Sequence, residues 1–196
     1  LLASSAASDV YKRQDNYFQV NIFTAVRRRV VWLFVLLLTN SVTGGIITAQ
    51  EDILQKVVVL AAFIPLLTGT GGNVGAQSST VVIRGMNTDE IWKMGPVKVI
   101  LREATAGAML GSILGLLATA WAYLFIVSGN LEVSVTVGIS LVAISILASV
   151  AGSSLPFLFR SFGLDPALMS APFITTAVDV LGVLIYFNLA RIILQI

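Results

Sequence analysis

One carboxylate in this sequence is notable for its position. Asp179 lies near the middle of an apolar segment, Ala167 to Ala190, about twelve residues from either end. A carboxylate at the bilayer midplane costs about 2.5 to 3.5 kcal/mol on insertion scales, and such residues mark ion or proton pathways by default. The alternative is an aspartic acid that locks helices together through hydrogen bonds. We expect a cation or proton site, because no His, Lys or Arg lies deep enough in another apolar segment to neutralise it.

The neighbours of Asp179 on the same helix face are small or carry oxygen. Positions three, four and seven residues away share that face. Oxygen ligands suit Mg²⁺ or Ca²⁺, whereas softer metals recruit the His and Cys that this chain lacks. Mg²⁺ releases its water reluctantly, so one carboxylate per subunit could hold a hydrated ion through the water shell. The face consists of Pro172, Thr175, Thr176, Gly182 and Tyr186.

A second polar stretch, GTGGNVGAQ at residues 69–77, interrupts another apolar segment. Asn73 and Gln77 are one helical turn apart and share a face, and the glycines leave the backbone without Cβ shielding. We expect a thin-walled segment whose carbonyls and amides face water, with Asn73 among the metal ligands; irregular backbone is tolerated at this depth only where protein buries it or water lines it. Helix packing through small residues is the alternative. The predicted pore-lining residues are Gly71, Gly72, Gln77 and Thr176.

Two further features have ordinary structural explanations. Gly107, Gly111 and Gly115 form a GxxxGxxxG ridge with no charge nearby, which predicts close helix packing. Asp165, in the connection GLDP, precedes the segment that holds Asp179, where an exposed carboxylate is more often a helix cap than a ligand.

The composition is that of a membrane protein. Of 196 residues, 57% are hydrophobic and 11% charged, and the mean hydropathy is +0.93. A formal charge of +2 is too small to indicate a nucleic acid as partner. The absence of both Cys and His excludes disulfides, Cys-ligated zinc and a Ser-His pair. Most familiar enzyme sites are thereby excluded.

We predict an all-α membrane protein with five transmembrane helices per subunit, since about 20 apolar residues cross a bilayer as a helix. Residues 1–14 resemble a non-native leader, 15–29 a cytoplasmic linker helix, and 30–196 the five-helix transmembrane pore domain. Short polar connections make neighbouring spans antiparallel. The spans are Val30 to Thr48, Lys56 to Ile83, Ala104 to Val127, Val133 to Phe159, and Ala167 to Ala190.

Basic residues predict the orientation, because cytoplasmic loops retain Lys and Arg. Eight of them fall on one side, which places the N-terminus inside and the C-terminus outside. An odd number of crossings gives no inverted repeat within the chain, so a pore is expected at or near the interface of a homodimer. The eight are Arg27, Arg28, Arg29, Arg84, Lys93, Lys98, Arg102 and Arg160.

Two sequence blocks in order resemble the MgtE-type magnesium channels and transporters. The first is PLLTGTGGNVGAQ, followed by IRG, and the second is LPFLFRSFGLDPALMSAPFITTAVDVLGVLIYF. The likeness extends over residues 15–196. It implies a homodimeric pore for Mg²⁺, with five helices per subunit and a lining from the second and fifth helices.

The resemblance also implies roles for single residues. It makes Asp179 the pore aspartate, and puts Thr175 at the level where a main-chain oxygen faces the water shell of the ion. It makes Asp165 a cation-binding carboxylate at the cytoplasmic mouth. Family members generally begin with a soluble helical domain and paired CBS domains that sense Mg²⁺. We therefore expect either a fragment or a form without the sensor, and carry over no gating.

The predicted function is Mg²⁺ movement across the plasma membrane, with Mg²⁺ as both bound and transported ion and the bilayer and a second copy as partners. One alternative is an exchanger of Mg²⁺ or Co²⁺ against Na⁺ or protons. A non-transporting scaffold would leave Asp179 and the glycine-rich stretch unexplained. An intramembrane enzyme is disfavoured, because one deep carboxylate without a second acid or base is poor equipment for acid-base chemistry.

Overall fold

The computed structural model describes residues 22–88 and 90–196, with backbone alone at 24, 25, 28, 29, 31, 32, 90 and 167–171. All regular elements in these ranges are helical. The predicted leader at 1–14 and the first part of the predicted linker, 15–21, lie outside them. From Ile22 the chain is helical, and helix α2 (Ile22–Ala49) continues past residue 30 without a break.

The chain divides into two units within α2. The first unit ends at Thr39, and its described part is the first portion of that helix. The second unit, Asn40–Ile196, holds every other element. These are the rest of α2, then α3 (Glu51–Lys56), α4 (Leu60–Asn87), α5 (Glu90–Met94), α6 (Pro96–Trp121), the π-helical turn η1 (Ala122–Ile126), α7 (Leu131–Ser161) and α8 (Pro166–Leu194).

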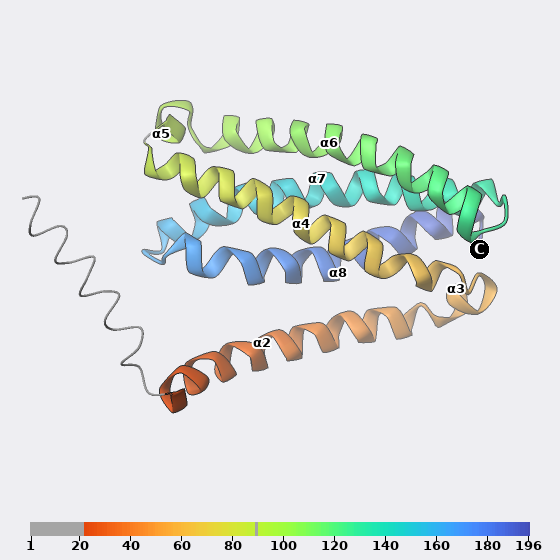
Figure 1. Cartoon of the computed structure of the whole chain (residues 1–196), viewed down its shortest axis with the longest axis horizontal. Coiled ribbons are helices and arrows are strands. Elements are labelled where there is room, and N and C mark those ends of the chain that lie inside the picture. The colour runs from red at the N-terminus through yellow and green to blue at the C-terminus, as the bar shows by residue number, and fades with distance from the viewer. Residues whose placement is uncertain (1–21, 89) are drawn as a thin grey trace, which may run out of the picture. The chain divides into compact units, whose positions relative to one another are not determined.

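In the second unit, α7 is the central helix. It packs against α6, α8 and α4, which run alongside it in Figure 1, with α5 at one end of α4 and α3 at the other. In the most apolar stretch of α7, 61% of the residues are buried, against 17% for α6 with η1. The helix that contacts most neighbours is therefore the one withdrawn from the surroundings, and α6 leaves a broad apolar face exposed.

Local sequence explains the ends of α7. The side chain of Asn130 accepts a hydrogen bond from the backbone N–H of Val133 at 3.1 Å, which caps the first turn. After the last turn, Gly163 adopts φ +71, a conformation that favours glycine. Pro166 then begins α8, where its missing N–H costs nothing. The connection is thus too short for anything but an antiparallel neighbour.

Three of the predicted spans are confirmed as helices long and apolar enough to cross a membrane: Pro96–Ile126, Leu131–Ser161 and Pro172–Leu194. A shorter apolar helix covers Leu33–Ala49. Helix α4 has 28 residues, but its Gly, Thr, Asn, Gln and Ser residues keep it outside that set. The fold is that of an all-helical membrane protein.

The glycine-rich stretch does not interrupt α4. The helix is continuous through Pro65 and the four glycines that follow. The expectation of irregular backbone facing water is therefore wrong, because the main-chain carbonyls of this segment are used within the helix. Pro65 lies in the second turn and has no N–H, so it donates no hydrogen bond to the Ala61 carbonyl, although the helix continues through it.

Glycines let the helices around α7 approach one another closely, and we call these contacts the glycine seam. A Cβ on Gly111 would lie 2.8 Å from that of Ser145, and one on Gly152 would land on the carbonyl oxygen of Gly75. The packing role predicted for the GxxxGxxxG ridge is confirmed. The seam consists of Gly107, Gly111 and Gly115 on α6, Gly138 and Gly152 on α7, and Gly71 and Gly75 on α4.

Candidate metal-binding site

Helix α8 presents a hydroxyl and a carboxylate on the side that is not packed. Thr175 is exposed and Asp179 is half-buried, one turn further along. Ile174 and Val178, the residues before them, are both fully buried. Since a helix cannot turn about its axis once two successive turns are packed, the burial of these aliphatic side chains fixes the direction of Thr175 and Asp179.

The counterpart of that packing is on α4. A Cβ on Gly71 would lie 2.7 Å from Val178 Cγ1, and one on Gly75 would lie 2.5 Å from Ile174 Cγ2. Two glycines one turn apart thus accept two aliphatic side chains one turn apart. Because the pairing runs in opposite directions along the two helices, α4 and α8 are antiparallel. The register of these two helices is set by glycine.

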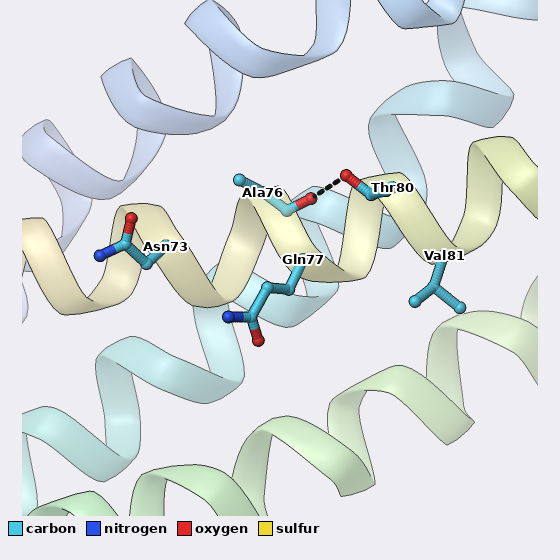
Figure 2. Close-up of a pocket in the computed structure, with 5 residues that line it drawn as sticks. All are labelled: Asn73, Ala76, Gln77, Thr80 and Val81. Atoms are coloured by element: carbon cyan, nitrogen blue, oxygen red, sulfur yellow. Dashed lines mark hydrogen bonds between the residues drawn. The ribbon is translucent and has the colours of Figure 1, made fainter.

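The exposed side of α4 carries amides. Asn73 and Gln77 are both exposed, and they line an open hollow with Ala76, Thr80 and Val81. Figure 2 shows their side chains leaving successive turns of one helix, with the Thr80 hydroxyl donating to the Ala76 carbonyl oxygen at 2.8 Å. The amides of Asn73 and Gln77 are therefore presented together on one face, as their spacing predicts.

The exposed sides of α4 and α8 adjoin at one point, where a Cβ on Gly72 would lie 3.7 Å from Thr175 Cγ2. The antiparallel register puts Asp179 one turn nearer the start of α4, beside the level of Gly69, whose Cβ position is open. We name this surface the polar edge. It comprises Gly69, Gly72, Asn73 and Gln77 on α4, with Thr175 and Asp179 on α8.

The two glycines predicted to line a pore lie in different surroundings. Gly72 is partly exposed on the polar edge. Gly71 is buried, and a Cβ there would lie 2.5 Å from Ile144 Cγ2. Packing between α4, α7 and α8 accounts for Gly71, whereas Gly72 reaches the exposed side of α4. Two consecutive residues of one helix thus differ in burial, because successive positions point about 100° apart around the helix axis.

The oxygen-bearing stripe around Asp179 is shorter than its spacing suggests. Thr176 is half-buried and remains near the edge, but Gly182 and Tyr186 are buried inside the bundle. Tyr186 donates to the Leu60 carbonyl oxygen at 3.0 Å, a contact that sequence spacing does not reveal. The prediction of a single exposed face is wrong at this end, because the beginning of α4, at Leu60, covers Tyr186 there.

Asp165 does not belong to the same group. It is exposed in the connection before α8, fourteen residues from Asp179. At 1.5 Å per helical residue this separation is about 20 Å along the axis. The two carboxylates of one chain are therefore too far apart to hold one ion directly.

A dehydrated metal ion would need more carboxylates than the described part of the chain brings together. Within that part, no three His, Cys, Asp or Glu residues come together. The polar edge offers instead one carboxylate, one amide oxygen on each of Asn73 and Gln77, and the hydroxyl of Thr175, which itself donates to the Pro172 carbonyl oxygen at 2.9 Å. Such a donor set fits an ion that keeps most of its water.

The helical fold and its long apolar helices define an integral membrane protein. Residues 64–189 match the MgtE family, described as divalent cation transporters. The chain belongs to that family, which consists of transport proteins and not enzymes.

The chain is also similar to three proteins named magnesium transporter MgtE. It is 41% identical over 167 residues to the one from Thermus thermophilus, with 85% of this chain and 36% of the relative covered. Those from Bacillus subtilis and Enterococcus faecalis are 36% and 34% identical, covering 90% and 89% of this chain and 39% and 38% of the relatives. The chain thus spans well under half the length of these relatives.

Proposed function

We propose that this chain forms the membrane pore of a Mg²⁺ transport protein, in which Asp179 attracts the ion and holds it through its water shell. The observation that carries the proposal is the polar edge, where α8 carries an exposed hydroxyl and a half-buried carboxylate and the neighbouring helix α4 exposes two amides. The choice of Mg²⁺ as the ion rests on the names of the similar proteins. Mg²⁺ retains its water more firmly than Ca²⁺, which suits a site with one carboxylate per subunit.

The polar edge also supports a homodimer. Exposed amide and carboxylate groups are costly against lipid, and in membrane proteins they face other protein or a water-filled path. A second copy related by a two-fold axis would cover the edge and bring a second Asp179 to the same level. Two carboxylates would then match the charge of one Mg²⁺. Thr175, Thr176, Asn73, Gln77 and Gly72 would line the path.

The distribution of basic residues supports an orientation of the chain in the membrane. The connections on the side of Arg84, Lys98 and Arg160 would be cytoplasmic under the positive-inside rule, with the C-terminus outside and the protein in the plasma membrane. A membrane potential of 100 mV, negative inside, supplies about 4.6 kcal/mol for a divalent ion, twice the single-charge figure. Uptake would need no other energy source. Asp165 would lie at the cytoplasmic mouth as a second, weaker cation site.

Mg²⁺ flux into liposomes tests the proposal. The full chain is reconstituted with an internal Mg²⁺ indicator, and a potential is imposed. Wild type is expected to admit Mg²⁺. The rate should fall at least about tenfold in Asp179→Asn, equivalent to 1.4 kcal/mol or more. In Asp165→Asn it should fall by a smaller factor. The matched control is Asp52→Asn, an exposed carboxylate of α3, with an unchanged rate.

Two results would contradict the proposal. Normal flux in Asp179→Asn would remove the carboxylate from the mechanism, and no flux in wild type would favour a scaffold. Flux that requires an opposed Na⁺ or proton gradient would identify an exchanger in place of a passive pore.

A further inference from the structure

A second polar site lies apart from the polar edge, where α4 ends and α6 begins. A cavity of about 360 Å³ lies between the last turns of α4, the short helix α5 and the first turns of α6. Its walls combine apolar side chains with two guanidinium groups and one carboxylate. The lining residues used below are Val81, Arg84, Met94, Val99, Arg102 and Glu103.

The cavity is held open by defined packing. A Cβ on Gly85 would lie 2.5 Å from Ile91 Cδ1, so the missing side chain at Gly85 is what allows α5 to dock on α4. Trp92 fixes the other side of α5, since its indole N–H donates to the Met86 carbonyl oxygen at 3.3 Å and its ring meets Phe157 edge-on at 6.1 Å. The guanidinium of Arg160 lies 4.7 Å from the centre of the same ring.

The charges lining this cavity are not neutralised within it. Among the described residues, neither Arg84 nor Arg102 makes a hydrogen bond or an ion pair, and both side chains are exposed. Glu103 is the one carboxylate in the lining, so the walls carry a surplus of one positive charge. A phosphodiester carries one negative charge. The cavity and a single phosphodiester are therefore electrostatically complementary.

The apolar walls distinguish a lipid from a soluble phosphate. Val81 and Met94 are 56% and 41% exposed beside the arginines, and α6 continues from the cavity into an apolar helix of a membrane-spanning family. Charged groups at the end of such a helix lie where hydrocarbon meets water. Basic pockets between membrane helices at this depth bind anionic lipid headgroups. A free phosphate would leave Val81 and Met94 uncovered.

We propose that the cavity between α4, α5 and α6 binds the phosphodiester of an anionic glycerophospholipid, with Arg84 and Arg102 on the phosphate and an acyl chain along the exposed side chains of Val81 and Met94. Glu103 limits the site to headgroups with a single negative charge and can accept hydrogen bonds from the glycerol hydroxyls of phosphatidylglycerol. The bound lipid would tie α5 to the ends of α4 and α6.

Fluorescence of Trp92 gives a direct test, because it lies on α5 beside the cavity. In the full chain carrying Trp32→Phe and Trp121→Phe, quenching is measured in mixed micelles with brominated phosphatidylglycerol or brominated phosphatidylcholine. With the cavity unchanged, the protein is expected to bind phosphatidylglycerol about fivefold more tightly than phosphatidylcholine. This is the effect of one surplus basic residue near an anionic lipid. The double variant Arg84→Gln, Arg102→Gln should lose the preference. Glu103→Gln should raise it by a similar factor.

The matched control is Lys93→Gln with Lys98→Gln, which removes two positive charges at the same end of the bundle without changing the lining. It is expected to keep the preference, and thermal unfolding confirms that each variant is folded. Equal quenching by both lipids in wild type would overturn the proposal. So would loss of the preference in the lysine control, which indicates general surface charge, or displacement of the lipid by inorganic phosphate.

Discussion

The glycine seam and the polar edge are built from similar small and polar residues, yet they face in opposite directions. In the seam, Gly107 and Gly111 of α6 meet Ser145 and Ser149 of α7, and the serines are fully buried. On the polar edge, Asn73, Gln77 and Thr175 are exposed. The same kinds of residue thus serve helix association in one region and leave an open polar surface in the other.

The difference shows what decides the role of a small residue in a membrane helix. Gly71 and Gly72 are adjacent in sequence, but Gly71 is buried against Ile144 and Val178, whereas Gly72 is half-buried and in ordinary contact with Thr175. Close approach through Gly71 and Gly75 holds α8 in the rotation that exposes Thr175 and Asp179. The seam is therefore the support on which the polar edge depends.

The largest effect on stability is expected where the seam brings a glycine closest to another helix's backbone. In Gly152→Ala the new methyl group meets the main-chain carbonyl of Gly75, which cannot move aside as a flexible side chain can. Overpacking of this kind costs about 1 to 3 kcal/mol. Thermal unfolding in detergent measures the loss. The matched control Gly69→Ala has open space at Cβ and is expected to lose nothing; a loss as large as that of Gly152→Ala would contradict the distinction.

A smaller effect should separate the two adjacent glycines. In Gly71→Ala the methyl group meets Ile144 and Val178, whose side chains can give way in part, so we expect a cost of about 1 kcal/mol. In Gly72→Ala the methyl group is in ordinary contact with Thr175, and we expect no loss of stability. Unfolding midpoints of the two variants provide the comparison. Equal midpoints would show that the seam does not include Gly71.

The smallest effect, with opposite sign, is expected at Ser149. Its hydroxyl is buried without a hydrogen-bond partner in the described structure. Removing an unsatisfied polar group is neutral or stabilises by about 1 kcal/mol. Ser149→Ala should therefore unfold at the same or a higher temperature. Ser153→Ala is the control, since that hydroxyl donates to the Ser149 carbonyl oxygen at 2.7 Å; a lower midpoint for Ser149→Ala alone would contradict this account.

Much of the fold follows from the sequence, because hydrophobic length and glycine spacing are local properties. The prediction for Gly107, Gly111 and Gly115 needed only their period of four. Helix α6 nevertheless begins at Pro96, eight residues before the predicted span at Ala104, since its first turns carry charges that an apolar window excludes.

The candidate site was predictable to a lesser extent. The positions of Asp179 and Thr175 on one face of α8 follow from spacing alone, and Asn73 with Gln77 likewise. Which face of α4 packs could not be read from the sequence, because Gly71 and Gly72 differ only in the partners that α7 and α8 bring. The buried hydroxyl of Tyr186 finds its hydrogen-bond acceptor at the carbonyl of Leu60, a residue distant along the chain, which spacing does not reveal.

The central claim is that the polar edge faces a water-filled ion path while the outer face of α6 meets lipid. The sequence contains no cysteine, so a single introduced Cys is the only thiol that the reagent can modify. The most direct measurement compares Thr175→Cys on the edge with Leu116→Cys on α6, where Leu116 is 74% exposed, using a charged, membrane-impermeant thiol reagent in proteoliposomes. We expect Thr175→Cys to react and Mg²⁺ to slow that reaction, and Leu116→Cys not to react. Equal reactivity at both positions, or no protection by Mg²⁺ at Thr175→Cys, would contradict the claim.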